Sequence, residues 1–209
     1  RRFSPYRVDS EVAELNRNPA HVPSAELSEI LAIAETTRIE SGGFFNVVRP
    51  DGRIDPTGIV KGWAIQNAAR MLTNQGYENF CIDLGGDIAF SGKNDSGEAW
   101  RVGVRSPFNH QDIVKTLIPR GKGVATSGSA ARGNHIYNPH NPKEPVREVV
   151  SITVVGPDIL TADRYATAAF AMGADGARFI EAVPGCEAYQ ISADGIATMT
   201  SGFLELTRA

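Results

Sequence analysis

The amino-acid sequence predicts an α+β fold. Apolar residues recur at three- and four-residue spacing over 59–72 and again over 27–34, which is typical of helices that pack on one face. Residues 100–105 alternate with period two and, with 112–118 after an intervening turn, predict a β-hairpin. No G-x-G-x-x-G follows a predicted strand, so a doubly wound nucleotide-binding fold is the less favoured alternative.

One helix–strand unit lies at the centre of this prediction. A turn at Asp55-Pro56-Thr57-Gly58 precedes the helix over 59–72, and Gly76 is placed to end that helix as a C′ glycine. An apolar strand over 79–84 follows and ends in Gly85-Gly86-Asp87. Turns of this kind let backbone amides and carbonyls approach a ligand closely, although an ordinary helix–strand unit with glycine turns has the same pattern.

Two helices are predicted before this unit. Asp9 or Ser10 is the natural N-cap of a short helix, and Glu11 then lies in the first turn, where the helix dipole favours an acidic side chain. The second helix runs from Ser24 to about Glu40.

After the hairpin, the sequence predicts a strand over 148–155 and a helix with two polar residues on one face. Thr161 is the predicted N-cap of this helix, and Gly173 ends it. Asp163 and Thr167 are four residues apart, so their oxygens lie on the same helical face. An Asp that satisfies the helix end and a Thr bonded to a backbone carbonyl give the same pattern, so spacing alone leaves a ligand role open. A helix and two strands complete the prediction, over 174–183, 186–192 and 196–200.

The composition is that of a globular protein. The 209 residues are 42% hydrophobic and 22% charged, which suits one domain or two closely merged ones with a sizeable core. A net charge of -3 argues against a general nucleic-acid surface, and Cys81 and Cys186 are too few for a disulfide framework. No apolar run reaches the roughly 20 residues of a membrane-spanning helix, and no signal peptide is recognised. The chain begins without methionine, which leaves two locations open: the cytoplasm, or a membrane reached through a missing N-terminal segment.

Short motifs follow one another along the chain in an order known from a single family. DPTGIVKGWA (55–64) matches D-[LP]-[ST]-[GAT]-[IV]-[AV]-K-G-[YW]-A, and LGGD (84–87) matches L-G-G-[DE]. FSPYRVDSEVAELN (3–16) and VATSG (124–128) match two further motifs of that family. TADRYATAAFAMG (161–173) matches A-D-x-x-A-T-A-x-[FL]-x-[ML]-G. The sequence therefore resembles the ApbE family, the FAD:protein FMN transferases, over nearly its whole length.

This resemblance implies the architecture as well. We expect one flavin transferase domain over 1–209, with a T-fold-like antiparallel sheet and packed helices. The strand that carries M-G-T before the first helix of the family has no counterpart here, so this N-terminal strand is expected to be missing. FAD is expected in a cleft between the regions of Tyr6, Phe44, Gly58 and Asp163.

The resemblance also implies a magnesium site. In the family the Asp and Thr of the last motif are magnesium ligands, and they correspond to Asp163 and Thr167. The backbone carbonyl of Gly58 is the third expected ligand. Magnesium prefers oxygen ligands and keeps several waters, so few protein ligands suffice. A cation of this kind neutralises the charge that grows on the leaving group in phosphoryl transfer.

Four residues are expected beside the flavin. Tyr6 corresponds to the family's aromatic residue that packs on the flavin ring. Phe44, Phe45 and Asn46 correspond to the family's G-A-F-D segment, in which Asn46 replaces the usual Asp. A backbone contribution to flavin binding survives that replacement, whereas a role for a side-chain carboxylate does not.

Three further residues are expected near the phosphates and the adenosine. Lys61, one turn into the central helix, can reach a phosphate or an adenosine oxygen. Asp55 matches a ligand-contacting Asp of the family, and an Asp before proline is equally typical of a plain turn. His135, in a segment similar to H-[IL]-x-[DN]-P, is the candidate for orienting the phosphates or handling a proton. Asp163 is the other catalytic candidate.

The function implied by the resemblance is magnesium-dependent transfer of FMN from FAD to a Thr hydroxyl of an acceptor protein, with release of AMP. The acceptor motif is D-x-x-[ST]-[GS]-[AST]-T, from which residues 194–198 depart, so we expect the acceptor to be a different protein. One alternative is magnesium-dependent hydrolysis of FAD to FMN and AMP, which in the family accompanies loss of the aromatic residue at the position of Tyr6. The other is a non-enzymatic FAD-binding protein, expected if Asp163 or Thr167 were lost.

Overall fold

The computed structural model describes residues 2–109, 111–120, 123–129 and 136–208. Its larger sheet has six strands, all antiparallel to their neighbours. In spatial order these are β1 (Phe80–Leu84), β2 (Asp87–Ser91), β5 (Gly123–Gly128), β6 (Val149–Gly156), β7 (Glu187–Ser192) and β8 (Ala197–Met199). A separate hairpin pairs β3 (Val102–Arg105) with β4 (Ile113–Leu117). The predicted α+β class, the hairpin and the strands are confirmed.

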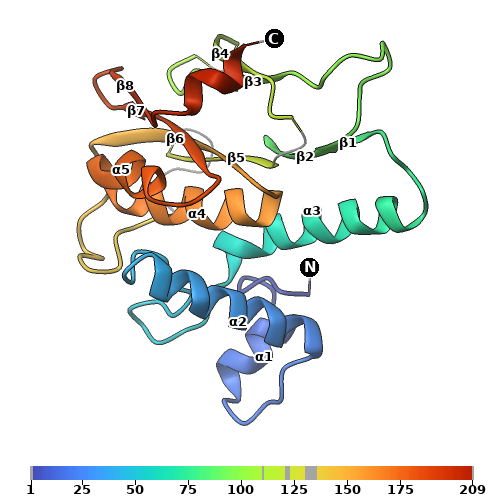
Figure 1. Ribbon diagram of the computed structural model, residues 1–209. Helices are drawn as coiled ribbons and strands as arrows, with labels where there is room; N and C mark the ends of the chain where they lie inside the picture. Colours follow the sequence, from blue (N-terminus) through green and yellow to red (C-terminus); the bar gives the residue numbers. More distant parts are fainter. Residues whose placement is uncertain (1, 110, 121–122, 130–135, 209) are drawn as a thin grey trace.

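Helices lie along one side of the large sheet, and the β3–β4 hairpin lies on the other (Figure 1). The helices are α1 (Glu11–Arg17), α2 (Ala25–Glu40), α3 (Thr57–Asn74), α4 (Ile159–Ala171) and α5 (Gly176–Glu181), with short 3₁₀ turns η1 (Gly173–Asp175) and η2 (Phe203–Thr207). Among the helices in the described ranges, none has both the length and the apolar character to cross a membrane.

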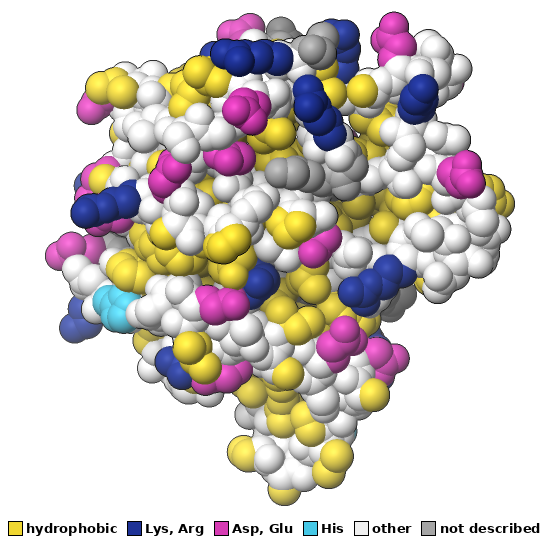
Figure 2. All heavy atoms as spheres, in the orientation of Figure 1, with side chains coloured by type: hydrophobic (Ala, Val, Ile, Leu, Met, Phe, Trp, Pro, Cys, Tyr) yellow, Lys and Arg dark blue, Asp and Glu magenta, His cyan; other side chains and the backbone are white. Residues whose placement is uncertain are grey.

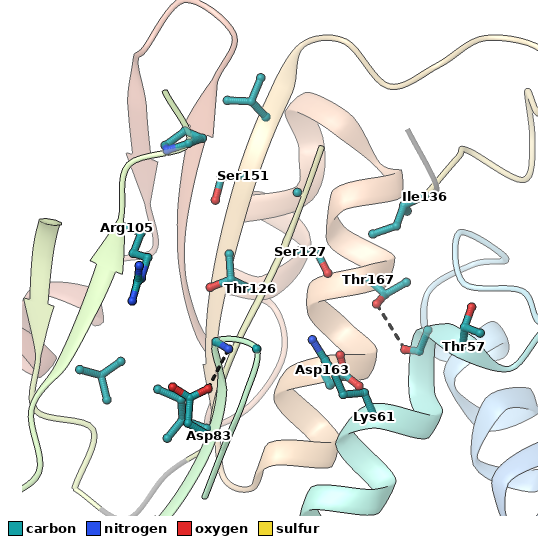
Figure 3. A pocket seen from close by; sticks show the side chains of 18 of the residues that line it. Thr57, Lys61, Asp83, Arg105, Thr126, Ser127, Ile136, Ser151, Asp163 and Thr167 are labelled. Atoms are coloured by element: carbon teal, nitrogen blue, oxygen red, sulfur yellow. Dashed lines mark hydrogen bonds between the residues drawn. The ribbon is translucent and has the colours of Figure 1, made fainter. Parts of the chain in front are cut away.

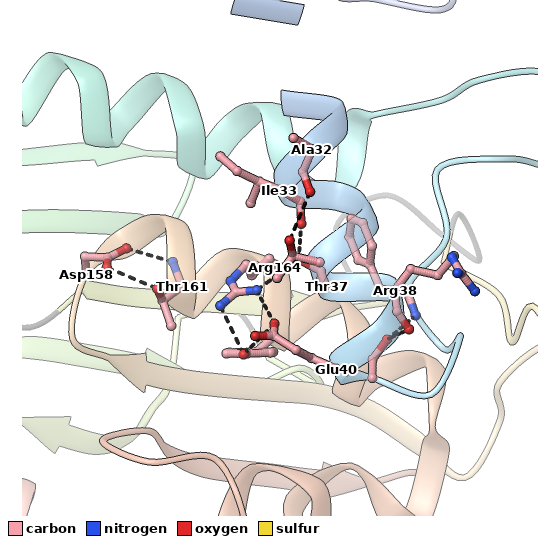
Figure 4. Close-up of polar contacts among 12 residues, drawn as sticks. Ala32, Ile33, Thr37, Arg38, Glu40, Asp158, Thr161 and Arg164 are labelled. Atoms are coloured by element: carbon pink, nitrogen blue, oxygen red, sulfur yellow. Dashed lines mark hydrogen bonds and ion pairs between the residues drawn. The ribbon is translucent and has the colours of Figure 1, made fainter. Parts of the chain in front are cut away.

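The ends of the helices follow from local hydrogen bonds. Ser10 rather than Asp9 caps α1, because its hydroxyl accepts the N–H of Ala13. The prediction that Thr161 caps α4 is wrong. Asp158 is the cap, since its carboxylate accepts the N–H of Thr161 at 2.8 Å and the Thr161 hydroxyl at 3.0 Å (Figure 4). The helix therefore begins at Ile159, three residues earlier than a cap at Thr161 would place it.

The strands of the large sheet contribute to two hydrophobic cores. Side chains alternate across a strand, so neighbouring residues face opposite sides. Ala125 and Val154 pack with the buried side chains of α4, whereas Val124 and Val155 pack with Val102 and other residues of the hairpin layer. Both faces of the sheet are thus covered, and on the face of the molecule in Figure 2 charged side chains of both signs are interspersed with hydrophobic ones.

A polar cluster fixes α2 on α4 (Figure 4). The Arg164 guanidinium donates to the hydroxyl of Thr37 at 3.1 Å and to the carboxylate of Glu40 at 2.5 Å. The Tyr165 hydroxyl donates to the same carboxylate at 2.9 Å. Burial, together with this hydrogen bond, raises the pKa of Tyr165 to about 12, so the phenol stays protonated as a donor. The cluster positions the loop that follows α2 and enters the cleft.

Two glycines allow α3 and α4 to approach each other closely. The N–H of Gly62 donates to the carboxylate of Asp163 at 2.7 Å. A Cβ atom on Gly62 would lie 2.7 Å from the Cβ of Asp163, and one on Gly58 would lie 3.1 Å from the methyl carbon of Thr167. One helical turn on α3 thus faces one helical turn on α4, with a glycine opposite each polar residue.

We therefore expect Gly62→Ala to destabilise the protein, by up to about 2 kcal/mol. Overpacking costs roughly 1–3 kcal/mol, and the gain in helix propensity of about 1 kcal/mol offsets only part of that cost. Urea denaturation measures the difference. Gly58→Ala is the matched control, and a smaller loss is expected because its nearest contact is a methyl group at 3.1 Å. A stability of Gly62→Ala at or above that of the unchanged protein would contradict this account of the helix contact.

Candidate functional site

A single cleft of about 1030 Å³ contains most of the predicted site residues. It lies at one end of the large sheet, where β2 begins and β5 ends, and it extends to the helices on one side and the hairpin on the other. Lys61, Asp163 and Thr167 lie on the helical side of the cleft, and Arg105 and Thr126 lie on the hairpin side (Figure 3). Protein pockets for small molecules and cofactors are typically about 300–1,000 Å³, so this cleft can hold a large ligand.

The predicted residues that line the cleft are Phe44, Phe45, Asn46, Asp55, Gly58, Lys61, Asp163 and Thr167. Tyr6 lies beside the cleft, and its hydroxyl donates to the Asp55 carboxylate at 3.3 Å. The predicted His135 lies outside the described residues. Residues widely separated in the sequence therefore come together at one place.

A buried acidic centre lies on the helical side of the cleft. The ammonium group of Lys61 forms an ion pair with the carboxylate of Asp87, whose side chain is 1% exposed. The second oxygen of Asp87 accepts the N–H of Thr126 at 3.1 Å. Asp163 adds a second buried carboxyl group beside this pair. Two carboxyl groups and one ammonium leave an excess of negative charge when both acids are ionised.

This arrangement raises the pKa of Asp163 to about 8. Burial is the largest cause, and the neighbouring negative charge of Asp87 adds to it. Lys61 and the N–H of Gly62 act in the opposite direction and lower the pKa by less. In the absence of a further cation, Asp163 therefore holds its proton near neutral pH.

Thr167 and Gly58 form the next part of the same helical interface. The Thr167 hydroxyl donates to the Gly58 carbonyl oxygen at 3.3 Å (Figure 3). Asp163 lies one turn earlier on α4, and all three residues line the cleft. The predicted common face of Asp163 and Thr167 is thus confirmed, and it faces the cleft rather than the core alone. This geometry brings a carboxylate, a hydroxyl and a carbonyl to one wall.

Asp55 is the centre of a second polar group at the mouth of the cleft. One carboxylate oxygen accepts the N–H and the hydroxyl of Thr57, at 3.1 and 2.7 Å, as in an Asx-turn directly before α3. The other accepts the hydroxyl of Tyr6 and pairs with Arg49, each at 3.3 Å. Asp55 therefore acts both as a turn residue and as the link between α3 and the N-terminal segment.

The segment after α2 has one half-buried aromatic residue, Phe44, and one buried aromatic residue, Phe45. Phe44 packs edge-on against His140, with ring centroids 4.6 Å apart. Phe45 is only 3% exposed, and its ring packs in a core cluster with α2 and α3. The Asn46 side chain accepts the N–H of Val48 at 2.9 Å, as in an Asx-turn. Phe45 thus reaches the cleft as part of a wall held by the core.

Sequence reasoning gave no site role to several residues in or directly beside the cleft. The most important is Asp87, a buried residue that is not itself part of the cleft lining but pairs with Lys61, which is. The position of Asp87 at the end of the Leu84-Gly85-Gly86-Asp87 motif indicated that this residue could have a role. The motif alone does not show which side chain Asp87 contacts. Arg49, Arg105 and Thr126 were also not predicted. Arg105 is one residue of a regular strand, and nothing in that pattern marks it as part of a site.

Within the described ranges, no cluster of three or more His, Cys, Asp or Glu side chains is arranged to hold a metal ion. A cation site in this cleft would depend on the mixed oxygen set of Asp163, Thr167 and Gly58, with Asp87 nearby. Hydroxyl and carbonyl oxygens suit hard cations such as Mg²⁺, and a buried carboxylate supplies the charge.

Fold and site together define an α+β protein with a ligand-sized cleft and a buried acidic centre. The model of the ApbE family matches residues 47–190, which is more than half of the chain. This protein therefore belongs to the ApbE family.

Related sequences carry one functional name. The FAD:protein FMN transferase of Salmonella typhimurium is 26% identical over 195 residues, which are 86% of this chain and 56% of the relative. That of Vibrio cholerae serotype O1 is 32% identical over 165 residues, or 75% and 48% of the two chains. The chain thus spans about half of the length of the curated relatives it matches.

Solved structures show the same fold. The ApbE protein of Thermotoga maritima superposes with a TM-score of 0.88 at 21% identity, covering 100% of this chain and 87% of the other. The flavin transferase ApbE of Vibrio cholerae superposes with a TM-score of 0.85 at 24% identity, covering 98% and 85%. The antiparallel sheet with packed helices is therefore the architecture of the family.

The raised pKa of Asp163 predicts how stability depends on pH when no metal is bound. An unfolded Asp has a pKa near 3.9, so between about pH 4 and pH 8 the folded protein keeps a proton that the unfolded chain releases. The free energy of unfolding should then fall as the pH rises through this window, by at most about 1.4 kcal/mol per pH unit.

Asp163→Asn should remove this slope, because the amide cannot ionise. Urea denaturation in the presence of a chelator, across that window, measures the slope in both proteins. Asp83→Asn, on an exposed strand, is the control and should leave the slope unchanged. An equal slope in Asp163→Asn would assign the pH dependence to another group.

Proposed function

We propose that this protein is a magnesium-dependent FAD:protein FMN transferase, which moves FMN from FAD to a Thr hydroxyl of an acceptor protein and releases AMP. The observation that carries this proposal is the convergence of Gly58, Asp163, Thr167 and Lys61 on one cleft of about 1030 Å³. The name shared by the matching relatives supports the choice of reaction.

The oxygen positions suit magnesium. In an octahedral site with bonds of about 2.0–2.1 Å, neighbouring ligand oxygens lie about 3 Å apart. The hydroxyl oxygen of Thr167 and the carbonyl oxygen of Gly58 are 3.3 Å apart. The carboxyl group of Asp163 is the third proposed ligand, and a divalent cation would balance the excess negative charge of Asp163 and Asp87. Bound there, Mg²⁺ would supply charge neutralisation for the pyrophosphate of FAD.

The protein's own groups have separate proposed tasks. Lys61 is positioned by its ion pair with Asp87 and contributes positive charge where phosphate oxygens would lie. Asp55, which lines the cleft, is proposed to bind ribose or adenine in exchange for one of its present partners. Tyr6 is 74% exposed, which leaves its ring available to stack on the flavin. Phe44, Phe45 and Asn46 are proposed to form the flavin-side wall.

Proton transfer from the acceptor Thr needs a base. His135 is proposed for this step or for orienting the phosphates. Asp163, a carboxyl group that lines the same cleft, is the alternative. We also propose that residues 1–209 act as one flavin transferase domain, because the cleft draws on segments from both halves of the described chain.

Hydrolysis of FAD to FMN and AMP is the second candidate function. It would use the same cleft, with water in place of the acceptor hydroxyl. The specific observation against hydrolysis is the presence of Tyr6, because in the family hydrolysis accompanies loss of the aromatic residue at this position. The Tyr6 hydroxyl also donates a hydrogen bond to Asp55. The non-enzymatic alternative is less favoured because Asp163 and Thr167 are both present and lie on the cleft.

The transferase is tested by mass spectrometry. The protein is incubated with FAD, Mg²⁺ and a peptide that carries the acceptor motif, beside a sample without peptide. An FMN-sized mass gain on the peptide Thr, absent with Asp163→Ala, is the expected result. FMN and AMP released without any adduct would instead support the hydrolase. Intact FAD in every sample would contradict both reactions.

The magnesium site gives a separate prediction. Thr167→Val keeps the shape of the side chain but removes the hydroxyl, so we expect the Mg²⁺ concentration for half-maximal transfer to rise about 10-fold or more. Titration of activity against Mg²⁺ measures the change. Thr167→Ser is the matched control, because it keeps the hydroxyl and should stay close to the unchanged protein. An unaltered Mg²⁺ requirement in Thr167→Val would remove Thr167 from the ligand set.

A further inference from the structure

The outer edge of β1 is open in the part of the chain that the structure describes. β1 is the terminal strand of the large sheet and pairs only with β2 among the described strands. Cys81, Asp83 and Leu84 are exposed. The strand, Phe80-Cys81-Ile82-Asp83-Leu84, has no Pro or Lys, and its pairing with β2 shows no bulge. Natural proteins commonly protect an edge strand with a Pro, a Lys or a bulge. An edge strand without any of the three is suited to pair with another strand.

The turn after β1 determines which backbone groups point outward. Gly85 and Gly86 have φ of 64° and 91°, as in a two-residue type I′ hairpin turn. In such a hairpin the flanking residues, here Leu84 and Asp87, exchange hydrogen bonds, and every second pair along the ladder does the same. Cys81 and Asp83 fall between these pairs. Their backbone N–H and C=O groups therefore point away from β2, toward the open edge.

This edge is continuous with the cleft. Cys81, Asp83 and Gly85 all line it. The turn leads directly into Asp87, which forms the ion pair with Lys61 beside Asp163. A strand laid along β1 would therefore have one end at the acidic centre. Figure 3 shows Asp83 at the edge of the space that contains Lys61 and Asp163.

We propose that the outer edge of β1 binds an extended segment of the acceptor protein, which adds to the sheet as a further strand and presents its hydroxyl residue to the cleft. This inference rests on the proposed transferase function. Pairing through main-chain groups supplies affinity with little dependence on sequence, and it sets the acceptor backbone at a fixed spacing from the catalytic groups.

The other edge of the large sheet does not offer this path. β8 has three residues and lies at the far end of the strand order from β1. The edge of β3 also borders the cleft, through Gly103 and Arg105, and is the competing site. It belongs to the two-stranded hairpin and has no direct chain connection to Asp87. β1 is therefore the edge strand whose outer backbone groups are open to pairing and whose turn leads directly to the acidic centre.

Residue-resolved hydrogen exchange, read by NMR, tests the docking site. The full chain with Mg²⁺ is examined alone and with a saturating peptide containing Asp-Ala-Val-Ser-Gly-Ala-Thr. We expect exchange of the Cys81 and Asp83 amides to slow by about 10-fold or more, because they gain hydrogen-bond partners. The amide of Ile82, which already pairs with β2, is the internal control and should change little. Protection on β3 instead, or no protection on either edge, would overturn the proposal.

A second measurement uses two N-methylated versions of the acceptor peptide. One is methylated at the odd-numbered residues and the other at the even-numbered residues, so that each loses the N–H donors of one edge of the extended peptide. Pairing through a single edge should make one peptide at least about 10-fold poorer as an FMN acceptor than the other. Equal rates would overturn edge pairing.

Transfer to the unmethylated peptide is scored separately. Transfer without protection at β1 would reject the docking site but keep the transferase, whereas protection without any adduct would reject the transferase and keep the docking site.

Discussion

The close contact between α3 and α4 is the constraint on which the site depends. Gly62 brings its backbone N–H within 2.7 Å of the Asp163 carboxylate, and a larger residue there would force Asp163 or the helices to shift. The same contact places Gly58 opposite Thr167 and turns Lys61 toward Asp87. Because the helices meet through a glycine and a buried acid, the interface leaves polar oxygens facing the cleft. A helix pair packed through large apolar residues would be more stable but would have no such wall.

The sheet completes the site from the opposite side. Asp87 opens β2 and receives the N–H of Thr126 from β5, so the acidic centre is anchored in the ladder as well as between helices. The Arg164 and Glu40 contact then fixes α2, which carries the loop with Phe44 into the cleft. Rigid elements therefore hold the groups proposed to bind metal and phosphate. The exposed ring of Tyr6, by contrast, is held mainly through its bond to Asp55.

Much of this could be predicted from the sequence. Helical spacing predicted α2 and α3, and the four-residue separation of Asp163 and Thr167 predicted their common face. The start of α4 was predicted wrongly, because Asp158 and Thr161 are both good caps and spacing does not show which one satisfies the first turn. The role of Asp87 could not be derived either. Its partner Lys61 lies on another element, and only the packing of sheet on helix brings the two charges together.

The separation of the site residues along the chain has a consequence for folding. Gly62 and Asp163 are 101 positions apart, and Gly58 and Thr167 are 109 apart. Closing loops of this size costs conformational entropy before any contact is gained, so such contacts form late and slow the folding of the chain. The nascent N-terminal half, with Lys61 already made, contains neither Asp163 nor Thr167. The wall formed by Gly58, Asp163 and Thr167 is therefore complete only after Thr167 has been made and α3 has packed against α4.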